Sequence, residues 1–354
     1  MSRLQVVSGK GGTGKTTVAA ALALALAAEG KRTLLVEVEG RQGIAQLFGT
    51  EALPYEERKI AVAPGGGEVY ALAIDAELAL LDYLQMFYKL GAAGRALRKL
   101  GAIDFATTVA PGVRDVLLTG KACEAVRRKD RSGRFVYDHV VMDAPPTGRV
   151  TRFLNVNDEV AGLARMGPVH HQAQSVMRVI KSPETAVHLV TLLEEMPVQE
   201  TADGVEELRA AGLPVGNVLV NMVRPRLLDE DAVRAATAGA ARADNGGAVR
   251  LEAGGAVRTE AGGAVRAPSG DRRADVARAL AAAGVGGAEQ LVDPLFAQAA
   301  EHARRVELER EQREALAKLR VPAYELPLLG GGVDLAGLYH LARELRRELG
   351  VSDA

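Results

Sequence analysis

Cysteine is almost absent from this chain of 354 residues, which contains only Cys123. A single thiol excludes a disulfide framework within the chain, and it excludes a Cys-x-x-Cys metal site within one chain. We therefore interpret Cys123 as a small, partly buried residue.

Net charge and long hydrophobic runs are lacking as well. The chain has 44 Lys and Arg residues against 45 Asp and Glu residues, which leaves a formal net charge of −1. No overall field therefore favours nucleic acid or an anionic membrane surface. The longest apolar run, residues 18–28, is too short to span a bilayer. These absences predict a protein without a nucleic-acid partner and without a stable membrane anchor.

What the chain does contain is a glycine-rich loop at residues 8–17, Ser-Gly-Lys-Gly-Gly-Thr-Gly-Lys-Thr-Thr. The apolar run 4–7 precedes it and the Ala/Leu-rich run 18–28 follows it, which predicts a strand, a loop and a helix. Gly9 and Gly14-Lys15-Thr16 fit the phosphate-binding loop pattern. In such loops the backbone N–H groups point at phosphate oxygens, next to the positive end of a helix.

This loop predicts a site for ATP and Mg²⁺. Lys15 would neutralise charge on the β- and γ-phosphates, and the Thr16 hydroxyl would bind Mg²⁺. Asp143 ends the apolar run 135–142 and is the expected second partner of the metal. The other nucleotide-binding residues expected in the loop are Gly11, Gly12, Thr13, Gly14 and Thr17. Because no signal peptide carries a phosphate loop, we expect a cytoplasmic protein.

Strands and helices alternate along the chain. The strand candidates are residues 33–38, 69–74, 135–142, 185–192, 217–220 and 322–326. Helices are expected over 77–100, 200–211 and 294–318, and after Asp334, which can cap a final helix with a leucine stripe packed on the sheet. The alternation predicts an α/β fold: a mostly parallel, doubly wound sheet of P-loop NTPase type with helices on both faces.

The composition changes over residues 240–272. Gly-Gly-Ala-Val-Arg occurs at 246–250, 254–258 and 262–266, with too little apolar bulk to form a core. We predict a flexible insert within a single domain that spans residues 1–354. A solenoid is the alternative, and the small size and number of the repeats disfavour it.

Lys10 indicates which class of phosphate-binding loop this is. The run Lys-Gly-Gly-x-Gly-Lys-Thr-Thr at residues 10–17 resembles the deviant Walker A loop of the MinD, ParA and ArsA group. The run Asp143-x-x-Pro146-Thr147-Gly148, followed by Arg152 and Leu154, resembles switch II of the ArsA family of arsenical-pump and tail-anchored-protein targeting ATPases. The resemblance covers roughly residues 3–228 and 290–350. Shorter matches are Ile74-Asp75, Pro111-Gly112, Glu200-Thr201, Val220-Asn221 and Leu326-Pro327-Leu328.

The resemblance implies an ATP-dependent dimer. In this group the first lysine of the loop, here Lys10, crosses the dimer interface to the nucleotide of the partner. The resemblance also implies that Asn221 and the loop at Pro327 bind adenine. The partner would be a second copy of the chain or a paralogous ATPase.

Three departures from the family pattern bear on activity. Glu39 replaces the switch I aspartate that positions the attacking water, and Asp-Pro-Ala-His-Ser becomes Glu-Gly-Arg-Gln-Gly at residues 39–43. One extra methylene moves the carboxylate by about 1.5 Å, and a misplacement of this size can lower a rate a hundredfold. The zinc-binding Cys-x-x-Cys of the family is absent, and a single thiol does not support arsenite transport.

The leading hypothesis is an ATP-binding dimeric switch protein of the ArsA type with weak ATP hydrolysis. Its catalytic residues would be Lys10, Lys15, Glu39 and Asp143. One alternative is a catalytically impaired subunit of a heterodimer with an active paralogue.

The second alternative is a MinD-like membrane-positioning ATPase that uses the C-terminal helix. Acidic residues offset the arginines of that helix, which disfavours binding to an anionic membrane.

Overall fold

The computed structural model of the protein describes residues 2–88, 111–163, 168–227 and 272–350. The chain divides into two compact units, Met1–Pro225 with Gln312–Ala354, and Arg226–Glu311. The single domain over 1–354 stays a prediction. Residues 240–271 of the expected insert lie outside the described residues.

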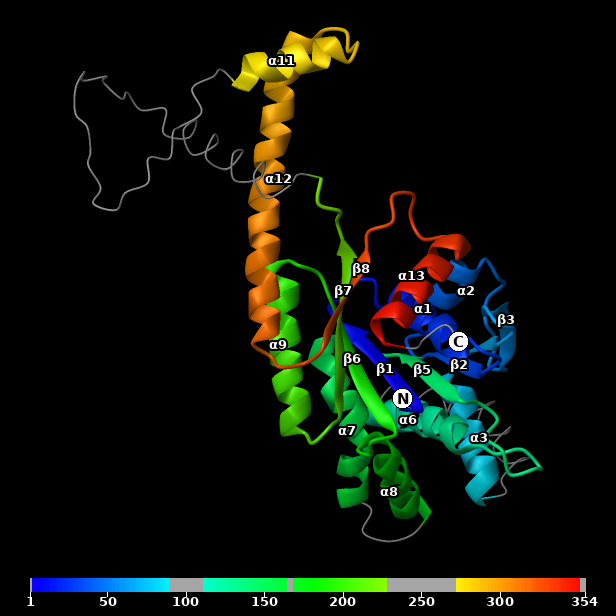
Figure 1. Cartoon of the computed structure of the whole chain (residues 1–354). Coiled ribbons are helices and arrows are strands. Elements are labelled where there is room, and N and C mark those ends of the chain that lie inside the picture. Colours follow the sequence, from blue (N-terminus) through cyan, green and yellow to red (C-terminus); the bar gives the residue numbers. More distant parts are fainter. Residues whose placement is uncertain (1, 89–110, 164–167, 228–271, 351–354) are drawn as a thin grey trace. The chain divides into compact units, whose positions relative to one another are not determined.

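An eight-stranded sheet forms the centre of the first unit (Figure 1). Its order is β3-β4-β2-β5-β1-β6-β7-β8, and every neighbouring pair is parallel except β3 and β4. The strands are β1 (Leu4–Gly9), β2 (Arg32–Glu37), β3 (Arg58–Val62), β4 (Glu68–Ala73), β5 (His139–Asp143), β6 (Thr185–Thr191), β7 (Val215–Val223) and β8 (Ala323–Pro327). The predicted mostly parallel sheet is confirmed.

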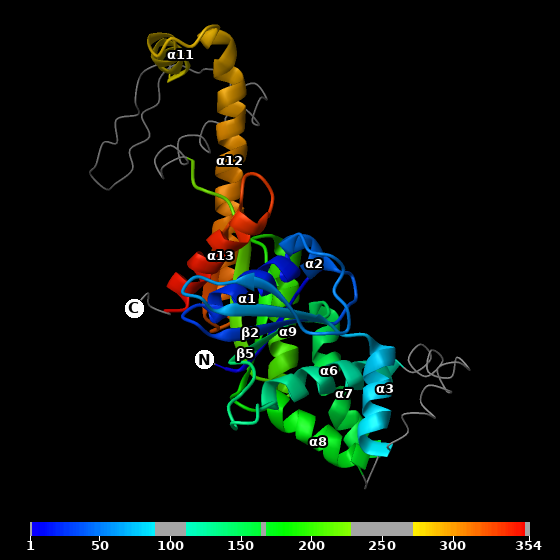
Figure 2. The same cartoon turned by 90° about the vertical axis from the view of Figure 1, so that its right-hand side faces the viewer.

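Helices cover both faces of this sheet (Figures 1 and 2). One face carries α1 (Lys15–Ala27), α2 (Gly43–Phe48) and α13 (Leu335–Glu348). The other carries α3 (Ala76–Tyr88), α6 (Pro111–Arg127), α7 (Thr147–Leu163), α8 (Pro168–Ile180) and α9 (Glu195–Ala210). Side chains alternate between the two cores along each strand: Leu34 and Val36 face one core, whereas Leu35 faces the other. The predicted doubly wound fold is confirmed.

The helix after the glycine-rich loop is apolar on all sides. A helix of this kind has to be covered on all sides. Accordingly, α1 contacts the sheet and α13. The predicted leucine stripe of α13 is buried at Leu338, Leu341 and Leu345, and Asp334 caps the helix by accepting a hydrogen bond from the N–H of Gly337 at 2.8 Å. The stripe packs chiefly on α1 and on β8 rather than on the sheet as a whole, because α1 presents an apolar surface outward.

Some elements differ from those predicted. Strand β3 was missed because it is an exposed edge strand without apolar alternation. Strand β5 begins at His139 rather than at residue 135, since Phe135 instead forms an isolated antiparallel bridge with Lys129 and is half exposed. The helix expected over 77–100 is described only as α3, and the remainder lies outside the described residues.

The second unit contains α11 (Arg272–Ala282) and most of α12 (Ala288–Ala317). The last residues of α12, from Gln312 on, belong to the first unit, where Leu316 is buried in one cluster with Val198, Val218 and Val220. In the described ranges, no helix combines the length and the apolar character that crossing a membrane requires.

A buried histidine connects three strands of the sheet. His188 on β6 is 5% exposed, and its Nε2 is 2.6 Å from Gln5 Oε1 on β1. Its Nδ1 accepts a hydrogen bond from the N–H of Asn217 on β7 at 3.0 Å. Nδ1 must therefore be unprotonated and Nε2 must carry the proton. Burial lowers the pKa of His188 to about 4.

We predict that acid weakens the fold through His188. The unfolded chain binds a proton at this residue below an ordinary pKa of about 6.5, whereas the folded chain does not until about pH 4. The stabilisation is thus complete above pH 6.5 and is lost as the pH falls toward 4, by up to about 1.4 kcal/mol per pH unit. Denaturant unfolding of wild type and His188→Gln between pH 4 and 7 measures this effect. The free energy of unfolding should depend less on pH in the variant, and equal slopes would contradict the prediction.

Candidate nucleotide-binding site

The glycine-rich loop connects β1 to α1, as predicted. Gly14 immediately precedes the helix with φ of 82°, a left-handed conformation. A Cβ atom on Gly14 would lie 2.4 Å from Asn221 Nδ2, and one on Gly9 would lie 2.2 Å from the carbonyl oxygen of Val190. Only glycine permits both the turn and these close approaches.

Lys15, Thr16 and Asp143 lie together at the carboxyl ends of β1 and β5. Thr16 Oγ1 donates a hydrogen bond to Asp143 Oδ2 at 2.7 Å. Burial raises the pKa of the Asp143 carboxyl to about 6, although the bond from Thr16 and the charge of Lys15 act in the opposite direction. A hydroxyl beside a carboxylate supplies the oxygen ligands that Mg²⁺ prefers.

Lys15 is largely covered, with 9% of the residue exposed. Among the described residues, its ammonium group has no hydrogen-bond or ion-pair partner. A lysine at the end of a glycine-rich loop, beside a helix start, can neutralise phosphate charge, and its charge also acts on the Asp143 carboxyl. The residues present therefore fit a phosphate group with its Mg²⁺.

The other loop residues occupy positions consistent with an open cradle. Gly11 and Gly12 are exposed, and a Cβ atom on either would meet nothing within 4 Å. Thr13 is buried, and its hydroxyl donates to the carbonyl oxygen of Lys10 at 2.8 Å. Thr17 lies in the first turn of α1.

Asn221 lies beside the loop, whereas Pro327 lies on the neighbouring strand. Asn221 on β7 is buried, and its Nδ2 donates to the carbonyl oxygen of Thr13 at 2.9 Å. Pro327 ends β8 opposite Val223 of β7. Both residues are thus near the carboxyl edge of the sheet, and their role in adenine binding stays a prediction.

Lys10 forms an ion pair within the chain. Its Nζ lies 2.5 Å from Glu200 Oε1 on α9, and the two side chains are 31% and 38% exposed. The sequence matches had singled out both residues, but nothing in the sequence indicated that they pair.

The carboxylates after β2 occupy different environments. Glu39 lies in the loop with a side chain 20% exposed, and its Oε2 is 3.8 Å from Arg41 Nη2. Glu37, which the sequence analysis did not assign to the site, is 2% exposed and lies opposite Asp143 in the strand register. The signal was present in the sequence, because Glu37 is the only charged residue in the otherwise apolar and β-branched run 33–38.

Cys123 is fully buried on α6, and burial raises the pKa of its thiol to about 12. Cys123 is thus more deeply buried than the partly buried residue that the sequence predicted. Within the described ranges, no cluster of three or more His, Cys, Asp or Glu residues could hold a metal ion.

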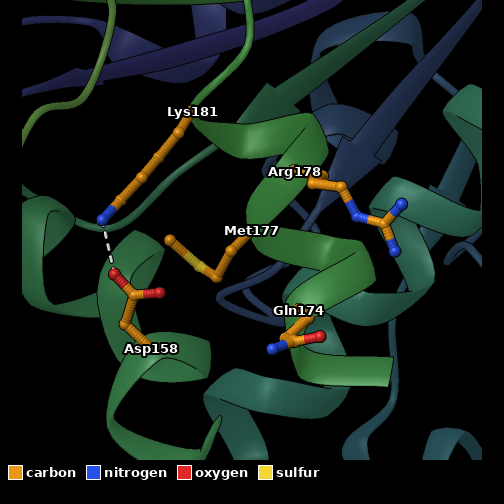
Figure 3. Close-up of a pocket in the computed structure, with 5 residues that line it drawn as sticks. All are labelled: Asp158, Gln174, Met177, Arg178 and Lys181. Carbon is orange, nitrogen blue, oxygen red and sulfur yellow. Dashed lines mark hydrogen bonds and ion pairs between the residues drawn. The ribbon is translucent and has the colours of Figure 1, made fainter. Parts of the chain in front are cut away.

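A hollow of about 510 Å³ lies between α7 and α8 (Figure 3). It is lined by Asp158, Gln174, Met177, Arg178 and Lys181, and Asp158 forms an ion pair with Lys181 across it. Asp158 lies about 16 Å along α7 from Thr147, where the helix leaves the site. None of the residues predicted for the nucleotide site lines this hollow.

A glycine loop between the central strand of a parallel sheet and a helix, with a buried lysine, a threonine and an acidic strand end, defines a P-loop NTPase fold. Within that class, the chain belongs to the anion-transporting ATPase (ArsA) family, whose family model matches residues 2–182.

Several known proteins are similar to this chain. The chain is 49% identical to ATPase BagA of Mycobacterium tuberculosis over 348 residues, which cover 98% of this chain and 93% of that protein. It is 26% identical to ATPase GET3 of Kluyveromyces lactis over 251 residues, 61% of this chain and 71% of the relative. It is also 26% identical to the arsenical pump-driving ATPase of Escherichia coli over 241 residues, 62% of this chain and 39% of the relative.

Proposed function

We propose that this protein is a Mg²⁺-dependent ATPase that acts in the cytoplasm as a dimeric switch. The observation that carries the proposal is the glycine-rich loop between β1 and α1, in which Lys15 and Thr16 lie beside Asp143 and Thr16 donates a hydrogen bond to its carboxylate. The names of its relatives, which are ATPases, support the choice of nucleotide.

Each residue has a defined task in this proposal. Lys15 and the N–H groups of the loop bind the phosphates. Thr16 and Asp143 hold Mg²⁺, which would neutralise charge between the phosphates. Asp143 would act in its ionised form, which a bound cation favours. Asn221 and the Pro327 loop would bind adenine.

Lys10 would act on the nucleotide of the partner subunit. To do so it must leave Glu200, and the exposure of both side chains makes that ion pair easy to exchange. The partner would be a second copy or a paralogous ATPase.

Glu39 would position the attacking water. Hydrolysis would be weak because the glutamate carboxylate lies one methylene further out than that of the family aspartate. A catalytically impaired subunit of a heterodimer is the second candidate, and the same substitution supports it. The MinD-like alternative loses support, because Leu338, Leu341 and Leu345 of α13 are buried on the side that packs on α1 and β8, and only Leu335 at the start of the helix is exposed.

The binding site is tested by Lys15→Ala. Loss of a charged partner for the phosphates should weaken Mg·ATP binding at least about tenfold. Titration calorimetry measures the affinity. Lys31→Ala is the matched control, since that lysine has a side chain 43% exposed and lies before β2. Equal affinity in Lys15→Ala and wild type would contradict the assignment.

Turnover tests the role of Glu39. Steady-state phosphate release by the purified chain should be slower than about 1 per second, and Glu39→Asp should raise it because the carboxylate returns to the shorter reach. Turnover of about 1 per second or faster in wild type, abolished in Glu39→Gln, would show that glutamate performs this step without loss.

Association tests the role of Lys10. Lys10→Ala should leave nucleotide binding by the monomer largely intact and should weaken ATP-dependent association in analytical ultracentrifugation. Glu200→Ala, which removes only the partner of Lys10 within the chain, should associate at least as well as wild type. Identical association in wild type and Lys10→Ala would count against a role in trans.

A further inference from the structure

The loop that carries Glu39 is tied to the end of β2 by Glu37. Glu37 Oε1 accepts a hydrogen bond from the N–H of Gln42 at 2.5 Å, and Oε2 accepts one from the N–H of Ile44 at 3.2 Å. Both carboxylate oxygens are thus used within the chain, and they close the loop 38–41 at its base. A carboxylate 2% exposed would be unfavourable here without these donors.

Gln42 is held in a conformation that glutamine rarely adopts. Its φ of 57° and ψ of 24° are left-handed, a region that disfavours residues with a Cβ atom. Its side chain pairs with the backbone of Leu53 in both directions: Nε2 donates to the carbonyl oxygen at 3.2 Å, and Oε1 accepts from the N–H at 2.7 Å. An unfavourable conformation held by several bonds is found most often where function requires a fixed geometry.

These bonds, which we call the Glu37 bracket (Glu37, Gln42, Ile44 and Leu53), adjoin the candidate nucleotide site. A Cβ atom on Gly43 would lie 3.3 Å from Thr16 Cγ2, so the start of α2 lies directly against the proposed metal-binding threonine. Glu37 itself lies opposite Asp143 in the register of β2 and β5. The bracket therefore lies beside both residues proposed to hold Mg²⁺, with Gly43 against Thr16 and Glu37 next to Asp143 in the sheet.

We propose that Glu37 and Gln42 are positioning residues that fix the Glu39 loop against Thr16 before any nucleotide binds. Glu37 acts through the backbone of residues 42 and 44, and Gln42 acts through Leu53. The catalytic loop is then pre-organised by the chain itself rather than ordered by the ligand. This inference rests on the proposed ATPase function for its catalytic consequence, but not for the bracket itself.

Amide hydrogen exchange of the full-length, nucleotide-free protein tests the bracket. Glu37→Gln keeps the shape of the side chain but sets an NH₂ group against one of the two N–H donors. Exchange in peptides that cover residues 38–48 should rise about tenfold or more, while peptides from the phosphate loop at 8–17 stay unchanged. Glu39→Gln, which removes the neighbouring carboxylate without touching the bracket, should exchange like wild type.

A second variant tests the bracket independently, in case Glu37→Gln fails to fold. Gln42→Gly removes the bonds to Leu53, and glycine accepts the left-handed conformation at this position. Its exchange over residues 38–48 should also rise. Wild-type exchange in this segment for either variant would overturn the proposal, and so would an equal rise throughout the chain, which would mean a purely structural role.

Kinetics tests the catalytic consequence. In Glu37→Gln the affinity for Mg·ATP should stay within about threefold of wild type, whereas kcat for phosphate release should fall about tenfold at unchanged KM. Loss of affinity together with kcat would overturn the positioning role and would indicate a direct contact with the nucleotide or metal. If wild type binds no ATP but hydrogen exchange in both variants rises as expected, the proposed ATPase function is wrong and the positioning role of Glu37 and Gln42 is still supported.

Discussion

The parallel register of β1, β2 and β5 brings the polar groups of the candidate site to one edge of the sheet. Val7 and Glu37 both lie opposite Asp143, so the segments after β1 and β2 leave the sheet on either side of the same carboxylate. The same strands bury apolar side chains on both faces up to this edge. The layered core therefore fixes where the strand ends that carry these groups lie.

Acidic side chains and Lys15 lie close together at this edge of the sheet. Glu37 accepts two backbone N–H bonds, and Asp143 accepts a bond from Thr16. Lys15 forms no direct hydrogen bond or ion pair among the described residues, although its charge acts on the Asp143 carboxyl. A lysine beside backbone N–H groups at a helix start is the arrangement expected of an anion-binding site.

Sequence reasoning located the parts that depend on a few neighbouring residues. The glycine loop, Asp143 at a strand end and the Asp334 cap are all of this kind. Strand β3 was not predicted because Arg58 and Lys59 occupy an exposed edge, where no apolar alternation arises. The Glu37 bracket was not predicted because a left-handed backbone at a glutamine leaves no signal in the sequence. The Lys10–Glu200 pair joins residues 190 positions apart, which no local pattern can indicate.

The two sides of the site are held with different strengths, and this bears on how the proposed switch would work. Four hydrogen bonds hold the Glu37 bracket, two of them to a buried carboxylate, and bonds to charged groups contribute about 1.5–3 kcal/mol each. Lys10 is held by one ion pair between partly exposed side chains, which contributes at most about 1 kcal/mol. A nucleotide or a partner subunit can therefore move Lys10 away from α9 far more easily than it can move the Glu39 loop. In the proposed dimer, nucleotide-dependent change should be concentrated on the Lys10 side, with the Glu39 loop as the fixed part of the site.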